Sequence, residues 1–155
     1  MSPPTKKYKR PESVLVVVYT RTGKVLLLRR TDDPGFWQSV TGSLQWEEQE
    51  PRLAAVRELR EETGLEPLEL KETGWVNRYT ILPQWRYRYA PEVKENTEHV
   101  YFLALPSERA INLNRAEHTE YGWYSFEAAA EKAASWSNRE AILRLKEYVE
   151  TSHEV

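Results

Sequence analysis

The sequence contains no cysteine, which excludes disulfide bonds and thiolate metal sites and is typical of proteins from a reducing compartment. It also lacks a long apolar run, because the longest, residues 14–19, is far too short to span a bilayer. The basic residues near the N-terminus are not followed by the apolar segment of a signal peptide. From these absences we expect a cytoplasmic protein with no membrane partner.

The chain also lacks an excess of charge of one sign. Its 22 lysines and arginines are interspersed with 24 acidic residues, and the net charge is −2, so nothing indicates a nucleic-acid partner. A length of 155 residues predicts one domain, residues 1–155, with a flexible segment at 1–7. A monomer and a dimer are equally compatible with the sequence. The six tryptophans and nine tyrosines are many for this length, and such planar side chains can hold a flat ring.

Strand patterns dominate the chain outside its centre. Apolar or alternating runs predict a hairpin of residues 13–20 and 25–29, followed by strands at 36–40, 68–75, 79–82, 85–89, 98–105 and 121–124. A serine cap at Ser125 opens one helix, and residues 138–149 predict another. Because strands and helices do not alternate in βαβ units, we expect an α+β fold with one mixed β-sheet sandwiched between α-helices.

The centre of the chain, residues 41–65, combines a glycine turn with a helix. Residues 41–43 predict a tight turn, Pro51 suits a first helical position, and Gly64 is a typical stop signal. Leu53, Val56 and Leu59 recur at a spacing of three, which predicts an apolar stripe facing the core.

Three carboxylates lie on another face of the same predicted helix. Glu58, Glu61 and Glu62 are spaced by three and four residues, which places them roughly opposite the apolar stripe. For such a spacing alone a solvated acidic face would be the better interpretation. The preceding glycine, the Arg57-Glu58 pair and Gly64 favour a magnesium site instead, since Mg²⁺ prefers oxygen ligands shared between carboxylates and substrate phosphates.

This combination resembles the Nudix box. Residues 57–65 match its second half in full, and Glu48 lies at the expected distance after Gly42. One extra residue separates Glu48 from Arg57, and we place it in the loop at residues 45–49, because an insertion within the helix would rotate the carboxylates. The first glutamate of the box, a support for Arg57, is therefore Glu47, Glu48 or Glu50.

The resemblance implies a Nudix fold and Mg²⁺-dependent hydrolysis of a phosphoanhydride bond, with Mn²⁺ as a possible replacement. It implies that Glu58 and Glu62 are metal ligands, that Glu61 is a ligand or contributes to the general base, and that Arg57 orients the glutamates. The carbonyl of Gly42 adds a ligand. A further ligand comes from outside the box, with Glu117 preferred over Glu98 and Glu120.

The rest of the chain resembles a bacterial branch of this family that releases pyrophosphate from a pterin triphosphate of folate synthesis. The matching segments are residues 8–11, 32–34, 36–43, 88–91, 96–98, 104–106 and 135–139. Carried over by position, the substrate contacts are Lys9, Arg30, Thr41, Tyr79, Thr80, Ile81, Leu82 and Ser135. The alternatives are a nucleotide-pool enzyme acting on dATP and, less favoured, a non-catalytic nucleotide-binding module. The partner expected in either enzymatic case is a small-molecule triphosphate.

Three further residues are ambiguous. Trp136 and Asn138 suit either a ring contact or the core and a helix cap, whereas His118 is more typical of a solvated loop histidine than of a proton shuttle.

Overall fold

The computed structural model describes residues 8–151, so the predicted flexible segment at 1–7 lies outside the described residues. Its elements follow in the order β1 (Glu12–Thr20), β2 (Lys24–Arg30), β3 (Trp37–Gln38), β4 (Val40–Ser43), α1 (Pro51–Thr63), β5 (Leu70–Thr80), the 3₁₀-helix η1 (Pro83–Arg88), β6 (Glu95–Leu105), β7 (His118–Ser125), α2 (Phe126–Lys132) and α3 (Trp136–Thr151). Among these residues no helix is long and apolar enough to cross a membrane.

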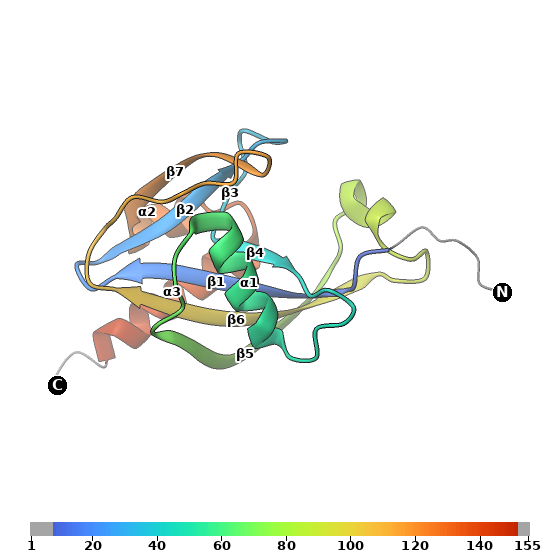
Figure 1. Ribbon diagram of the computed structural model, residues 1–155, viewed down its shortest axis with the longest axis horizontal. Helices are drawn as coiled ribbons and strands as arrows, with labels where there is room; N and C mark the ends of the chain where they lie inside the picture. Colours follow the sequence, from blue (N-terminus) through green and yellow to red (C-terminus); the bar gives the residue numbers. More distant parts are fainter. Residues whose placement is uncertain (1–7, 152–155) are drawn as a thin grey trace.

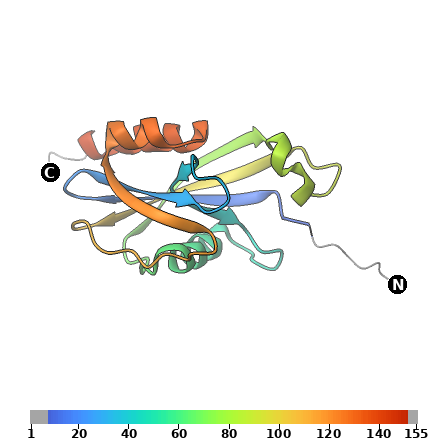
Figure 2. The same cartoon turned by 90° about the horizontal axis from the view of Figure 1, so that it is seen from above.

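The strands form one mixed sheet with a helical layer on each face. Helix α1 covers one face, and α2 and α3 cover the other (Figures 1 and 2). Alternation along β1 supplies both cores, because Val14 and Val16 pack on the α1 side while Leu15 and Val17 pack on the α3 side. The predicted mixed sheet between helices is confirmed.

The sheet forks beside β1, and the fork makes room for the site. Strand β1 is parallel to β6 over its whole length but is registered with β2 only at Tyr19 and Val25. Further along, β1 pairs instead with the antiparallel β4, from Val16–Val40 to Ser13–Ser43. Strand β2 diverges from β1 at this point and pairs with the antiparallel strands β3 and β7.

Helix α1 has the predicted ends but a different buried face. Pro51 occupies its first turn, and Gly64 ends it in the left-handed region at φ 77°, with its N–H donating to the Arg60 carbonyl at 2.9 Å. Leu59 is buried as expected, whereas Leu53 is 52% exposed, so the predicted apolar stripe is partly wrong. Ala54 and Ala55 are fully buried instead. Their small side chains let the helix lie close to the sheet.

Three local predictions differ from the structure. Residues 41–43 belong to strand β4, not to a turn. In place of the two predicted strands at 68–75 and 79–82 there is the single strand β5, Leu70–Thr80, whose register shifts between Glu72 and Val76 around Gly74, at φ 81°. Residues 85–89 are not a strand, because Pro83 starts the 3₁₀-helix η1 and the Trp85 N–H donates to the Leu82 carbonyl at 2.9 Å.

Candidate active site

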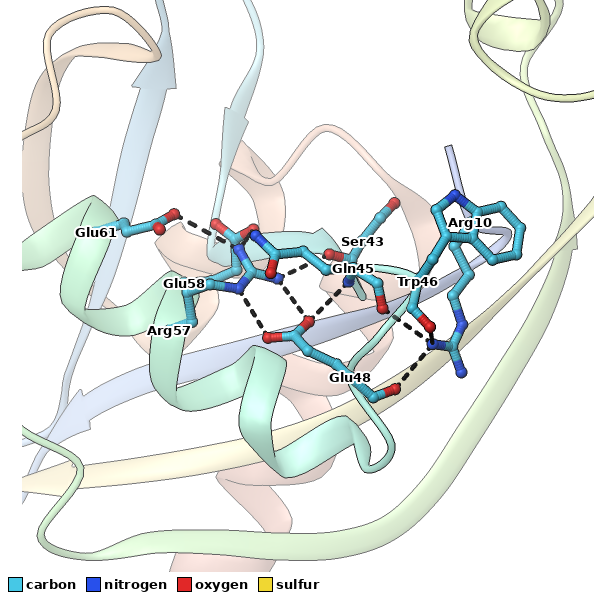
Figure 3. Close-up of polar contacts among 8 residues, drawn as sticks. All are labelled: Arg10, Ser43, Gln45, Trp46, Glu48, Arg57, Glu58 and Glu61. Atoms are coloured by element: carbon cyan, nitrogen blue, oxygen red, sulfur yellow. Dashed lines mark hydrogen bonds and ion pairs between the residues drawn. The ribbon is translucent and has the colours of Figure 1, made fainter. Parts of the chain in front are cut away.

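Arg57 on α1 is the centre of a network that joins the helix to the loop before it (Figure 3). Its Nε and Nη2 donate to the two carboxylate oxygens of Glu48, both at 2.9 Å, and Nη2 also donates to the Ser43 carbonyl at 3.0 Å. Its Nη1 donates to Glu58 Oε2 at 2.9 Å and lies 3.6 Å from Glu61 Oε1. The hydrogen bonds to Glu48 are the main reason why the pKa of Arg57 is raised. Arg57 thus holds Glu48 and Glu58 by hydrogen bonds and lies close to Glu61.

The network also settles which glutamate supports Arg57. Glu48 does so, whereas Glu47 and Glu50 are exposed. The extended loop is held by Arg10, whose Nη1 donates to the carbonyls of Gln45, Trp46 and Glu48 at 3.0, 3.3 and 2.8 Å (Figure 3). The extra residue therefore lies in the loop, and the helix keeps an unbroken register from Pro51 to Thr63.

Glu58 and Glu62 lie together at the inner face of α1, next to the core and not opposite to it. They are 9% and 2% exposed, and Glu62 Oε1 has no hydrogen-bond partner among residues 8–151. Burial raises the pKa of both, and for Glu62 the nearby Glu58 raises it further. A divalent cation bound here would neutralise the two buried carboxylates and would give the unpaired Glu62 oxygen a partner.

Gly42 on β4 faces this pair across the gap between strand and helix. A Cβ at this position would overlap the Glu58 carboxylate, so the absence of a side chain makes room for it. The site fits a hard divalent ion such as Mg²⁺, because all its candidate ligand atoms are oxygens. The unpaired buried carboxylate oxygen and the space beside Gly42 agree with this.

The other predicted acidic ligands are placed differently. Glu61 is exposed and turned to Arg57, and no set of three acidic or histidine side chains is gathered as a ligand group within the described part of the chain.

Glu117 lines the same cavity as Glu58 and raises the pKa of Glu62 through its charge. Glu120 is 3.5 Å from Arg29, and Glu98 lies two strands away from β4, so the geometry favours Glu117 among the three.

A cavity of about 590 Å³ extends from these carboxylates over the α3 side of the forked sheet. Its lining residues come from the segment before β1, from each of the strands β1–β6, and from the helices α1 and η1. The loop before β7 and the start of α3 also contribute to the lining. Lys9, Arg10, Arg30 and Arg88 supply its positive charge, and Arg10 is paired with Glu12. Burial is the largest cause that lowers the pKa of Lys9, followed by the charge of Arg88. Lys9, Arg30 and Arg88 beside a carboxylate pair are suited to a polyphosphate that carries a metal ion.

Arg30 is held in place by charge and by rings. Its Nε and Nη2 donate to the two oxygens of Asp32 at 2.8 and 2.7 Å. Its guanidinium lies 5.3 Å from the Trp85 ring centre and 5.7 Å from that of Phe36. The aromatic and basic residues at 85–89 therefore contribute to the cavity, although the structure has them in a helix.

The predicted substrate residues divide into two groups. Lys9, Arg30, Thr41, Tyr79 and Ser135 line the cavity. Thr80 and Leu82 are exposed and Ile81 is buried, and none of these three lines it. Ser135 also accepts the Asn138 N–H at 3.1 Å at the start of α3. Of the 79–82 segment, the structure therefore brings only Tyr79 to the cavity lining.

Several lining residues have no place in the predicted site. Asn96 is one, and Glu98, considered above only as a metal ligand, is another; both are buried in β6, where the sequence signal was the Asn-Thr-Glu segment at 96–98.

His118 is 1% exposed, which corrects its interpretation as a solvated residue. Its Nε2 is 3.0 Å from Gln38, and burial lowers its pKa to about 4. Asn138 is buried and connects α3 to the segment before β4, because its Oδ1 accepts the Ser39 N–H at 2.8 Å.

A family model described as a NUDIX domain matches residues 9–145. The chain therefore belongs to the Nudix family, and it is a pyrophosphohydrolase, as the box resemblance predicted. The Nudix fold is confirmed by the same match. Nudix hydrolases generally need a divalent metal ion, and a small phosphate-bearing substrate fits this class.

The chain is similar to the dihydroneopterin triphosphate diphosphatase of Escherichia coli K12, with 48% identity over 142 residues that cover 88% of this chain and 93% of the relative. The enzyme of the same name from Haemophilus influenzae is 40% identical over 141 residues, covering 88% and 87%. A solved structure of the E. coli dihydroneopterin triphosphate pyrophosphohydrolase superposes with a TM-score of 0.83 at 45% identity, over 88% of this chain and 95% of that one.

Proposed function

We propose that this enzyme hydrolyses dihydroneopterin triphosphate to dihydroneopterin monophosphate and pyrophosphate, a step of folate biosynthesis. The observation that carries the proposal is the continuous cavity, which joins Glu58 of the buried carboxylate pair and several lysine and arginine side chains to the polar residues Asn96 and Glu98. The names of the similar E. coli and H. influenzae enzymes support the same substrate.

In the proposed reaction the oxygen of a water molecule forms a bond to phosphorus, and the bridging bond between the α and β phosphates breaks. Glu58 and Glu62 would hold Mg²⁺, together with Glu117 and the Gly42 carbonyl. The ion would neutralise charge on the phosphate oxygens. Arg57 positions Glu58 and Glu61, and Glu61 contributes to the removal of a proton from the attacking water.

The substrate is held by groups at both ends of the cavity. Lys9, Arg30 and Arg88 neutralise phosphate oxygens, and Thr41 and Ser135 offer hydroxyl groups along the path between the ends. Tyr79 belongs to the ring end. Because phosphoryl transfer depends on positioning and charge stabilisation, these contacts supply much of what the reaction needs from the protein.

The test is turnover of purified protein with dihydroneopterin triphosphate and Mg²⁺, with the products resolved as monophosphate and pyrophosphate. Glu58→Gln and Glu62→Gln should each lower kcat by about 100-fold or more, a loss of roughly 3 kcal/mol of transition-state stabilisation. Glu131→Gln, an exposed position on α2, is the control and should keep full activity. Full activity in both cavity variants would reject the proposed site, and a higher kcat/KM for dATP than for the pterin would reject the proposed substrate.

A further inference from the structure

Glu98 is a buried carboxylate without a cation. It is 3% exposed and lines the cavity from β6. Its Oε1 accepts from Asn77 Nδ2 at 3.2 Å, and the hydroxyls of Ser137 and Tyr79 lie near enough to lower its pKa. No lysine or arginine within residues 8–151 forms an ion pair with it. A carboxylate offers about four acceptor positions, so the one hydrogen bond from Asn77 leaves Glu98 able to accept two more.

Asn96 lies two residues earlier, on the same face of β6. It is also 3% exposed and lines the same cavity. Its Nδ2 donates to Ser13 Oγ at 2.8 Å and to the Tyr79 hydroxyl at 3.0 Å, whereas its Oδ1 has no hydrogen-bond partner among the described residues. Leaving such a buried acceptor unpaired is unfavourable. The end of the cavity at β6 is therefore lined by acceptor side chains.

The distance from the carboxylate pair suits an elongated substrate. Ser13 on β1 is registered with Ser43 of β4 on one side and with Glu98 of β6 on the other. Neighbouring strands are about 4.8 Å apart, so the backbone of Glu98 lies roughly 10 Å from the strand that carries Gly42. A ring linked to phosphates by a chain of several bonds spans such a separation.

The geometry points to Glu98 as the residue that recognises the ring, by accepting two parallel N–H bonds from a 2-amino-4-oxopyrimidine edge. This inference rests on the proposed function and names its specificity determinant. A pterin presents its ring N3–H and its 2-amino group side by side, and these match the two oxygens of a carboxylate as a guanidinium does. Adenine presents an amino group beside a ring nitrogen that accepts, so a carboxylate would meet one lone pair with another.

Burial favours the same ligand class. Desolvation raises the pKa of Glu98, so the protein groups around it do not fully compensate its charged form. Two N–H donors from a ring would supply that compensation without a cation. The site should accept guanine better than adenine, since guanine shares the donor pair with a pterin.

The experiment compares Glu98→Gln with Glu95→Gln, which is the same chemical change at an exposed position of the same strand. A glutamine keeps the acceptor for Asn77 but replaces one acceptor by a donor. For dihydroneopterin triphosphate, Glu98→Gln should raise KM by about 10- to 100-fold with little change in kcat, because one bond to a charged group is lost. Its KM for dATP should stay the same or fall. Glu95→Gln should change neither.

Equilibrium binding of phosphate-free ligands gives a second readout. Wild-type protein should bind dihydroneopterin, and guanosine more tightly than adenosine, and Glu98→Gln should lose both the pterin affinity and the preference for guanosine. Unchanged pterin affinity in the variant, or equal losses for pterin and adenine ligands, would overturn the role of Glu98. If wild-type protein binds the pterin through Glu98 but does not hydrolyse its triphosphate, the proposed function fails while the ring recognition stands.

Discussion

Arg57 and Glu48 are joined by two parallel hydrogen bonds of 2.9 Å, across a loop one residue longer than the Nudix box pattern. Their side chains are 20% and 11% exposed, so the pair is shielded from water. The ion pair shows that the longer loop has kept the support of the catalytic helix.

We predict that Glu48→Gln lowers the free energy of unfolding by about 1–2 kcal/mol, since one bond to a charged group is lost. It should also lower kcat by about tenfold, because Arg57 then positions Glu58 less firmly. Urea unfolding and turnover measure the two effects. The matched controls are Glu47→Gln and Glu50→Gln, which are exposed and should stay within about 0.5 kcal/mol of wild type. A loss of equal size at Glu47 or Glu50 would contradict this assignment.

Gly42→Ala should inactivate the enzyme by displacing Glu58. The new methyl group would overlap the Glu58 carboxylate, so either the strand or the side chain must move. We expect kcat to fall by about 100-fold or more and the free energy of unfolding to fall by about 1–3 kcal/mol. Gly35→Ala is the control, since its nearest atom would be Asp33 Oδ1 at 3.8 Å. Normal turnover in Gly42→Ala would show that Glu58 does not need this position.

Local signals in the sequence predicted the catalytic helix well. Pro51 and Gly64 fix its ends through backbone geometry alone, which is a property of a few adjacent residues. The buried face was harder to predict, because Leu53 points to solvent while Ala55 packs against the sheet. Which face of a helix is buried depends on how close it comes to its neighbour, and periodicity alone does not contain that distance.

Contacts between distant segments account for the remaining differences. The alternation at residues 85–89 is typical of a strand, but Pro83 and the packing of Trp85 against Arg30 and Phe36 place it in a helix. Tyr79 lines the cavity and Thr80 does not, because successive side chains of a strand point to opposite faces. The segment at residues 96–98 marked Glu98 as a candidate, but only the pairing of β6 with β1 shows that it reaches the cavity.

Mg²⁺ should stabilise the wild-type protein without substrate, because it neutralises Glu58 and Glu62. At about ten times its Kd, an ion that binds only the folded state adds about 1.4 kcal/mol, which corresponds to roughly 3–6 °C in Tm. In Glu62→Gln the shift should be below about 1 °C, while the metal-free variant should be more stable than metal-free wild type, since a buried charge is removed. Thermal unfolding in MgCl₂ and in EDTA measures both. An equal shift in the variant would exclude Glu62 as a ligand.

The buried carboxylate of Glu98 should make the free energy of unfolding depend on pH, and the Glu98→Gln substitution should remove this contribution. Burial raises the pKa of Glu98 above its ordinary value of 4.5. The folded state therefore keeps this proton to a higher pH than the unfolded chain, so the stability linked to Glu98 is complete below pH 4.5 and is lost as pH rises through the folded-state pKa. Glu98→Gln has no such loss, because an amide does not titrate.

The difference in unfolding free energy, Glu98→Gln minus wild type, should thus increase from pH 4.5 to pH 7.5. Urea unfolding in EDTA without ligand measures it, and the subtraction cancels the contributions of Glu58, Glu62 and His118, which both proteins share. The groups facing Glu98 in the fold are Asn77, Tyr79 and Ser137, none of which titrates in this range, and the charge of His99 acts in the opposite direction by lowering the pKa. A difference that stays constant with pH would mean that Glu98 titrates like a solvated carboxylate, and the acceptor-rich end of the cavity would then be open to water before a ring arrives.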